Sequence, residues 1–187
     1  SNITPVEKNA IKEAAERTGA RRVFIEEEPK VAAIGAGMDI SKPSANIVID
    51  IGGGTTDIAV LSLGDIVTSA SVRIAGNVFD HDIIKYIRDK YKLLIGERTA
   101  EKIKIDFACC YNADKKQTLE VKGRNLITGL PHMITINQEE TEEALKESVY
   151  KIVKAATTVL EQTPPELSAD IVNKGIVLTG GGAMLKG

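Results

Sequence analysis

Two apolar strands in this sequence are each followed, at once or after one residue, by three consecutive glycines. The strands are expected at residues 46–51 and 176–178, and the glycine triplets occupy residues 52–54 and 180–182. A glycine triplet costs backbone entropy on folding, but it leaves backbone N–H groups uncovered and lets the chain approach a ligand closely. Two such junctions in a chain of 187 residues predict two loops that together hold one nucleotide.

The first junction carries side chains suited to phosphate and metal. Asp50 ends the strand, and Thr55 and Thr56 add hydroxyl donors. A carboxylate at such a strand end can hold a hydrated Mg²⁺ ion. Asp57 follows the threonines as a second carboxylate. The alternative, a flexible glycine hairpin, needs one or two glycines and no flanking carboxylates, so a phosphate-and-metal turn is favoured.

The second junction, residues 176–184, combines a strand, glycines and the start of a helix. Such a junction presents unpaired N–H groups at the positive end of a helix dipole, where a phosphate can bind. A tight strand-to-helix turn explains the same pattern equally well. The prediction of a ligand site therefore depends on the two junctions together.

The chain before the first junction has the pattern helix, strand, helix. Thr4 and Glu7 have the spacing of a capping box, which predicts the start of a helix. Residues 22–25 predict a short strand, and residues 31–34 predict a short helix. The polar residues 41–44 are the best candidate for an internal boundary.

Three strands with glycine-rich turns are predicted next, as an antiparallel meander over residues 46–72. A helix capped by Asn77 should follow, and a second helix should begin near Thr99. With short strands in residues 112–125 and 133–136, these helices form a small α+β insertion. The apolar face of the first helix consists of Phe79, Ile83, Ile84, Ile87 and Tyr91.

Asn137 and Glu140 are a second capping pair, and they open a long helix that Pro164 ends. After a short helix that closes at Gly175, residues 176–178 predict a buried strand. The apolar face of the long helix, which we expect in the core, contains Leu145, Val149, Ile152, Val153, Ala156, Val159 and Leu160.

The composition restricts which binding partners and which cell compartment are expected for this chain. The 24 Lys and Arg residues against 26 Asp and Glu give a net charge of −2, which argues against nucleic acid as a partner. Cys109 and Cys110 are adjacent, so a disulfide between them would be strained, and a reducing cytoplasm is expected. The sequence has neither a run of 18 apolar residues nor the pattern of an export signal.

The two junctions resemble motifs of the superfamily of actin, chaperone and sugar-kinase ATPases. The matching segments read Asp-Ile-Gly-Gly-Gly-Thr-Thr-Asp at residues 50–57 and Leu-Thr-Gly-Gly-Gly-Ala-Met at residues 178–184, and Glu28-Pro29 precedes a helix of small residues. Within this superfamily the chain resembles MreB, the bacterial actin family of rod-shape determination. The segments that carry this second resemblance are residues 25–37, 73–77, 95–101 and 163–167.

The resemblance implies an α/β actin-like ATPase fold of the ribonuclease H-like kind. Residues 1–45 would be the end of subdomain IA, and residues 46–75 with 138–187 would be subdomain IIA. Residues 76–137 would be the inserted α+β subdomain IIB. The family's first phosphate loop, and the strand and helix that follow the adenosine motif, would lie outside this sequence. The chain alone is therefore expected to be inactive and to bind ATP no tighter than about millimolar.

The resemblance also implies roles for individual residues. Glu28 would align the attacking water, although an acidic surface shared with Glu26 and Glu27 is the alternative, and Asp50 would organise Mg²⁺ through water. Glu101 and Lys104 would lie near the purine and ribose, or would only form a surface salt bridge with each other. The phosphates would be surrounded by Gly52, Gly53, Gly54 and Thr55, and the adenosine by Gly180, Gly181, Gly182 and Ala183.

The function implied is that of an ATP-hydrolysing protein whose subunits form filaments and guide cell-wall synthesis. ATP and Mg²⁺ are the expected cofactors. Expected partners are further copies of the protein and cell-wall synthesis and shape proteins at the inner face of the membrane, with membrane contact through parts outside this sequence. The first alternative is a chaperone-type or sugar-kinase ATPase of the same fold. The second is a scaffold that binds no nucleotide.

Overall fold

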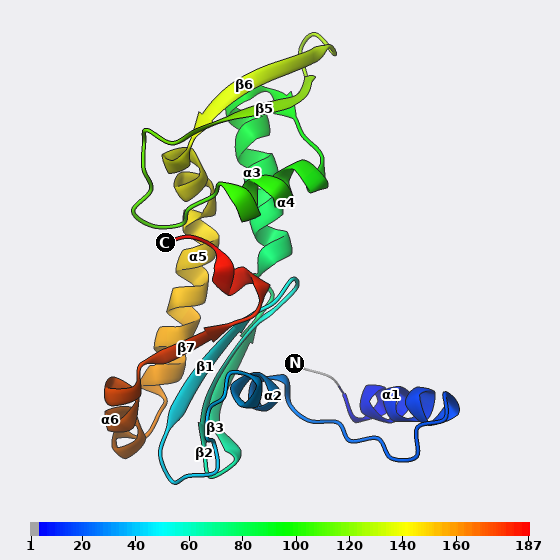
Figure 1. Cartoon of the computed structure of the whole chain (residues 1–187), viewed down its shortest axis with the longest axis vertical. Coiled ribbons are helices and arrows are strands. Elements are labelled where there is room, and N and C mark those ends of the chain that lie inside the picture. The colour runs from blue at the N-terminus through cyan, green and yellow to red at the C-terminus, as the bar shows by residue number, and fades with distance from the viewer. Residues whose placement is uncertain (1–3) are drawn as a thin grey trace. The chain divides into compact units, whose positions relative to one another are not determined.

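The computed structural model describes residues 4–187, which form two compact units (Figure 1). The first unit takes the chain up to Asp50 together with Asp57–Ser71 and Thr158–Thr179. The second unit consists of Ile51–Thr56, Val72–Thr157 and Gly180–Gly187. The predicted insertion, residues 76–137, falls wholly within the second unit, and the predicted subdomain borders stay a prediction.

A four-stranded sheet organises the first unit. It contains β1 (Asn46–Ile51), β2 (Thr56–Ser62), β3 (Asp65–Val72) and β7 (Ile176–Thr179) in the order β3-β2-β1-β7. The links between β1, β2 and β3 are so short that these neighbouring strands must run antiparallel, as the meander prediction requires. β1 and β7 pair in parallel, with Ile47 opposite Ile176 and Asp50 opposite Thr179.

The first unit also contains three helices: α1 (Pro5–Arg17), α2 (Glu28–Gly35) and α6 (Pro165–Lys174). The capping box predicted at the start of α1 is confirmed, because Glu7 N–H donates to Thr4 Oγ1 and Thr4 N–H donates to Glu7 Oε2. α2 packs on the sheet through a small apolar cluster. Its buried members are Ala33, Val48, Ala59 and Leu61.

Two predictions about strands in this unit are wrong. Residues 22–25 form no strand, and Phe24 is 86% exposed, because a strand needs a hydrogen-bonded neighbour and none of residues 4–187 supplies one. β7 exists but is not buried, since Ile176 is 46% and Leu178 55% exposed. β7 lies at the edge of the described sheet, so neighbouring segments do not cover it on all sides.

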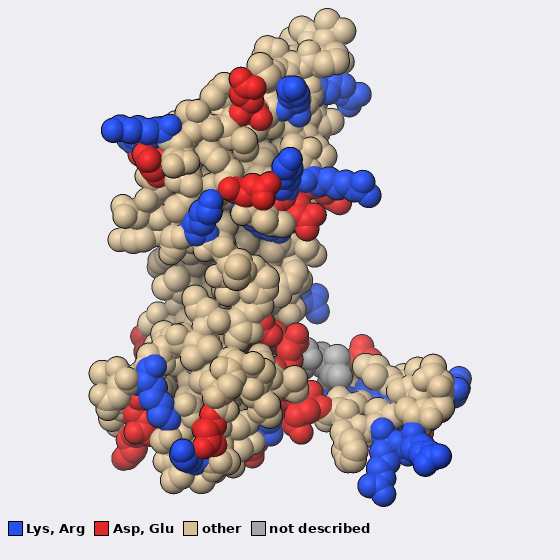
Figure 2. All heavy atoms as spheres, in the orientation of Figure 1, with Lys and Arg blue, Asp and Glu red and all other residues tan. Residues whose placement is uncertain are grey.

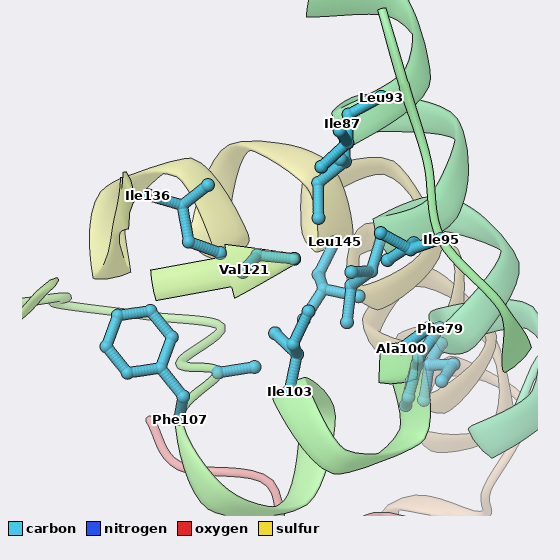
Figure 3. Close-up of a cluster of buried hydrophobic side chains, with 13 residues drawn as sticks. Phe79, Ile87, Leu93, Ile95, Ala100, Ile103, Phe107, Val121, Ile136 and Leu145 are labelled. Atoms are coloured by element: carbon cyan, nitrogen blue, oxygen red, sulfur yellow. The ribbon is translucent and has the colours of Figure 1, made fainter. Parts of the chain in front are cut away.

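The second unit consists of α3 (Gly76–Tyr91), β4 (Leu93–Leu94), α4 (Glu97–Asp106), β5 (Thr118–Asn125), β6 (Pro131–Asn137), most of α5 (Gln138–Glu161) and the 3₁₀ turn η1 (Gly181–Met184). Its three strands form an antiparallel sheet in the order β4-β5-β6. Side chains from α3, α4, α5 and this sheet converge in one apolar core (Figure 3). The core contains Phe79, Ile83, Ile87, Leu93, Ile95, Ala100, Ile103, Phe107, Ala108, Val121, Ile136, Leu145 and Ile152.

The capping pair predicted at the start of α5 is confirmed. Asn137 N–H donates to Glu140 Oε2 over 2.7 Å, and Glu140 N–H donates to Asn137 Oδ1 over 3.1 Å. Burial acts to raise the pKa of Glu140, but hydrogen bonds from Lys90, Tyr91 and the Asn137 N–H outweigh it and hold this pKa below its ordinary value. Glu140 therefore stays charged in a largely buried position.

Other helix predictions need correction in detail. α3 begins at Gly76, with Ala75 at the N-cap position and no side-chain cap, so Asn77 is not the cap. Along α5, Val153 is 54% exposed, because it lies about 80–100° around the helix from Leu145 and Ile152, at the margin of the buried face. No helix within residues 4–187 is both long and apolar enough to cross a membrane.

On the face drawn in Figure 2, charged side chains of both signs are scattered among uncharged residues. Within the second unit, Lys115 pairs with Glu139 over 2.9 Å and Lys151 pairs with Glu147 over 2.6 Å. Such exposed pairs contribute about 0–1 kcal/mol each to stability. The apolar cores, and not these pairs, therefore account for the stability of the units.

Candidate functional site

The two glycine triplets follow neighbouring parallel strands. β1 and β7 run side by side, and their last residues in the ladder, Asp50 and Thr179, lie opposite each other. Thr179 Oγ1 donates a hydrogen bond to Asp50 Oδ1 over 3.3 Å. Ligands of open α/β sheets bind at the carboxyl ends of parallel strands, and both triplets begin at such an end.

Both triplets line one pocket, which lies entirely within the second unit. Its volume is about 270 Å³, close to the lower end of the roughly 300–1,000 Å³ typical of ligand pockets. The rest of its wall comes from the start of α3, from α4 and from η1. The lining consists of Gly52, Gly53, Gly76, Asn77, Phe79, Glu101, Lys104, Ile105, Gly181, Gly182, Met184 and Leu185.

The first triplet forms an open loop whose carbonyl groups are held by α3. Gly52 N–H donates to Thr55 O over 3.0 Å and closes the turn. Gly76 N–H donates to Gly52 O over 3.0 Å, and Asn77 N–H donates to Gly53 O over 2.8 Å. The first N–H groups of a helix have no partner within the helix, so α3 uses two of them to fix the loop.

The second triplet is a tight turn and not the start of an α-helix. Gly180 has φ 84° and ψ 165°, a conformation that essentially only glycine adopts. At Gly182 an added Cβ would lie 3.0 Å from Ile51 O and would collide with the Ile51 side chain. The helix predicted here is a four-residue 3₁₀ turn. It is too short for the helix-dipole argument, so that part of the prediction is wrong.

Lys104 is held by a partner that the sequence analysis did not consider. Its Nζ lies 2.8 Å from Asp80 Oδ2 and donates to Gly76 O over 3.1 Å. The side chains of Lys104 and Asp80 are only 15% and 13% exposed. Glu101 is exposed and also lines the pocket. The alternative of a surface salt bridge between Glu101 and Lys104 is therefore wrong.

The structure brings together some of the predicted site residues and not others. Glu28 is the exposed first residue of α2, and Asp50 is the half-buried next-to-last residue of β1 in the first unit. The pocket lining contains neither of them. The predicted residues that line the pocket are Gly52, Gly53, Glu101, Lys104, Gly181 and Gly182, whereas Gly54, Thr55, Gly180 and Ala183 adjoin them in the chain without lining it.

Several lining residues were missed by the sequence analysis. Gly76 and Asn77 were recognised only as part of a family-like segment and a helix start, although a glycine at a helix start allows close approach of the backbone. The apolar wall had no signal of its own, because core and pocket side chains share the same helical periodicity. It consists of Phe79, Ile105 and Leu185, together with Met184 of the second junction.

The apolar, charged and backbone groups of the pocket fit a nucleotide. The apolar wall suits a planar base, and the charged groups of Glu101 and Lys104 suit polar atoms of a base or sugar. At Gly54 and Gly181 an added Cβ would meet no atom within 4 Å, so each triplet leaves open space in which a ligand could contact the backbone. The residues present therefore match a ligand that combines an apolar ring with anionic oxygens.

Mg²⁺ would depend on few protein ligands. Among residues 4–187, no three His, Cys, Asp or Glu side chains gather as a metal-binding group. Mg²⁺ usually keeps several waters and takes one or two carboxylates together with substrate phosphates. Asp50, the carboxylate before the first triplet, fits such a water-mediated role.

Comparison with known proteins identifies similar chains along the whole length. The family model described as MreB/Mbl protein matches residues 1–187. The cell shape-determining protein Mbl of Bacillus subtilis (strain 168) is 60% identical over 187 residues, which are 100% of this chain and 56% of that protein. The cell shape-determining protein MreB of Escherichia coli (strain K12) is 52% identical over 183 residues, or 98% of this chain and 53% of that protein.

Solved structures show the same architecture. The crystal structure of MreB 5 of Spiroplasma citri bound to AMPPNP has a TM-score of 0.95 at 44% identity and covers 100% of this chain and 56% of that chain. A MamK double helical filament has a TM-score of 0.80 at 22% identity, covering 100% of this chain and 55% of that one, and at this identity the likeness shows the fold alone. The predicted actin-like α/β fold is confirmed. The chain spans about half the length of the curated relatives it matches.

Proposed function

The chain belongs to the MreB/Mbl family, and from this premise we propose that it forms the nucleotide-binding part of an ATP-hydrolysing filament protein that determines rod cell shape. The observation that carries the proposal is the pocket of the second unit, in which two glycine triplets from distant parts of the chain meet. The likeness to a protein bound to AMPPNP supports an adenine nucleotide as the ligand.

ATP would bind with its base against the apolar wall and its phosphates near the open first loop. Uncovered backbone N–H groups favour anionic oxygens, and Mg²⁺, held by Asp50 through water and by the phosphates, would neutralise charge on the phosphates. Glu28 would align the water that attacks the γ-phosphate.

Assembly into filaments extends this proposal from the chain to the whole protein. The relatives, of which this chain spans about half, are named cell shape-determining proteins, and the resemblance of the sequence to the bacterial actin family implies filaments. We therefore infer that copies of the protein associate with one another in the cytoplasm. The filaments would act at the inner face of the membrane, together with proteins of cell-wall synthesis.

A titration of the 187-residue chain with Mg²⁺–ATP, followed by NMR, tests the proposed binding. We expect weak binding, no tighter than about millimolar, because contacts in an open, solvated pocket are screened. Chemical shift changes should centre on the amides of Gly52, Gly53, Gly181 and Gly182. The matched variants are Lys104→Met, in the pocket wall, and Lys102→Met, on the same helix outside it. Equal affinity of these two variants, or no shift changes in the glycines, would place the ligand elsewhere.

Hydrolysis and assembly are tested in a protein that carries this sequence within the full length of its relatives. Asp50→Ala should abolish Mg²⁺–ATP hydrolysis with the fold intact. Glu28→Ala should still bind ATP and polymerise, while phosphate release falls by about two orders of magnitude, the usual scale for a positioned acid or base. Sedimentation with and without ATP measures filaments. Filaments that form equally without nucleotide would favour a scaffold.

A further inference from the structure

Asp80 has a buried carboxylate oxygen, Oδ1, for which the described residues supply no hydrogen-bond partner. Its other oxygen, Oδ2, lies 2.8 Å from Lys104 Nζ. Buried polar atoms are rarely left without partners, and each exception needs a reason. A buried carboxylate with one unbonded oxygen contributes little to the stability of a fold. A role other than stability should therefore explain why an aspartate stands at position 80.

The Lys104 ammonium group keeps one donor beyond the two bonds that it makes to the protein. The ammonium group has three donors, and the two bonds from Nζ go to Asp80 Oδ2 and Gly76 O. Lys104 also belongs to the pocket lining. One donor is thus left for an acceptor that enters the pocket.

Gly76 connects this ion pair to the first glycine loop. Its carbonyl accepts from Lys104 Nζ, and its N–H donates to Gly52 O. An added Cβ on Gly76 would lie 3.4 Å from Lys104 Nζ and 3.3 Å from Gly52 O. The ammonium group is therefore packed closely against the backbone that holds the loop.

A lysine side chain has a flexible stem and tends to extend its charged end into water. Within residues 4–187, Lys104 has no charged partner on its own helix, because Glu101, one turn away on α4, does not pair with it. Without the Asp80 carboxylate, the side chain would lose the counter-charge that keeps it in the wall of the pocket.

We propose that Asp80 is a positioning residue. It holds the Lys104 ammonium at the pocket wall, so that the remaining donor meets an oxygen of the bound nucleotide. This inference rests on the proposed function, because the effect assigned to Asp80 is an effect on nucleotide affinity. The effect is transmitted through Lys104 alone.

A double-mutant cycle on the 187-residue chain tests this transmission. Asp80→Asn removes the charge with little change of shape, and we expect Mg²⁺–ATP to bind about tenfold more weakly, as for loss of a hydrogen bond to a charged group. Lys104→Met should weaken binding by a similar factor. The double variant should bind no more weakly than Lys104→Met alone. Native-like affinity of Asp80→Asn, or additive losses in the double variant, would overturn the proposal.

A second measurement needs no nucleotide. Acylation of lysines by an amine-reactive ester, followed by mass spectrometry, reports how firmly each ammonium group is held. Lys104 should react several-fold faster in Asp80→Asn than in the native chain, while the exposed Lys102 on the same helix reacts at an unchanged rate. Equal rates at Lys104 would overturn the positioning role. Failure of the native chain to bind nucleotide at all would instead overturn the proposed function, and the two failures are thus distinguishable.

Discussion

In the first glycine triplet, residues 52–54, the backbone forms an exposed loop, and an added Cβ would meet ordinary contacts or open space. In the second triplet, residues 180–182, Gly180 has a positive φ and Gly182 is packed against Ile51 with no room for a Cβ. Both triplets nevertheless line the same pocket. The same three letters therefore leave the backbone open in one place and allow tight packing in the other.

The difference separates two reasons for glycine that a sequence cannot distinguish. In the first loop the gain that we propose is access of a ligand to the backbone, so substitution should affect binding more than folding. In the second turn the gain is steric, so substitution should affect folding first. Unfolding in urea, measured by circular dichroism, tests this separation.

Gly182→Ala should have the largest effect, a loss of about 3 kcal/mol in the free energy of unfolding, because overpacking against backbone cannot relax through a side chain alone. The collision would be with Ile51, whose carbonyl oxygen would lie 3.0 Å from the new Cβ. Gly181→Ala is the matched control, since its Cβ would meet nothing within 4 Å. If both variants unfold at the same urea concentration, the steric account of the second turn fails.

Gly180→Ala should cost about 2 kcal/mol, within the range for a residue forced into a glycine-only conformation. Gly180 has φ 84° and ψ 165°, which a Cβ disfavours whatever space surrounds it. The midpoint of unfolding should fall without a change in the slope of the transition. A variant as stable as the native chain would mean that the turn can adopt another backbone conformation.

Glu140→Gln should destabilise the second unit by about 1.5 kcal/mol at neutral pH through loss of charged hydrogen bonds, without contact to either triplet. The folded-state pKa of Glu140 lies below its ordinary value of 4.5. Its contribution is therefore present above that value and is lost as the pH falls through the folded-state pKa.

The difference in unfolding free energy between the native chain and Glu140→Gln should accordingly shrink as the pH is lowered below about 4.5. Glu140 does not line the pocket of the glycine triplets. A loss of Mg²⁺–ATP affinity in this variant would therefore measure the effect of destabilisation alone. A difference that stays constant from pH 7 to pH 3 would contradict the assignment to the Glu140 charge.

Thr179→Val should cost about 1 kcal/mol or less, the value of one hydrogen bond. It removes the 3.3 Å contact from Thr179 Oγ1 to Asp50 Oδ1, which joins the two strands just before the triplets. Valine is well suited to a strand, so the sheet should persist. A loss above about 2 kcal/mol would show that this contact also supports the following turns.

Gly53→Ala should have the smallest effect on folding, within about 0.5 kcal/mol of the native chain, as for other exposed substitutions. Its Cβ would lie 3.5 Å from Asn77 Oδ1, an ordinary contact. Mg²⁺–ATP binding should nonetheless weaken several-fold, because Gly53 lines the pocket. Unchanged affinity together with reduced stability would reverse the comparison between the two triplets.

Local rules predicted much of the fold. The capping pairs Thr4 with Glu7 and Asn137 with Glu140 were correct, because each cap depends on residues three positions apart. The apolar face of α3 was correct for the same reason, since helical periodicity brings Phe79, Ile83 and Ile87 to one side. Each of these features is complete within a few turns of chain.

The errors arose where a partner comes from elsewhere in the chain. Whether residues 22–25 form a strand, and how far β7 is buried, depends on neighbouring segments and not on the strand's own residues. Lys104 was assigned a possible partner one turn away, but it pairs with Asp80, which lies 24 positions away in the sequence. Nothing in the local pattern around Lys104 specifies that distant carboxylate.

The sequence by itself determined where the glycines stand, which strands precede them and which family motifs they match, because these are properties of neighbouring residues. The two junctions also predicted that both triplets serve one site, and both line one pocket. Only the tertiary structure decided that Gly182 packs on Ile51 and that Gly76 joins Lys104 to the first loop. The physical reason is that excluded volume and hydrogen bonding act between atoms that the fold brings together, whatever their separation along the chain.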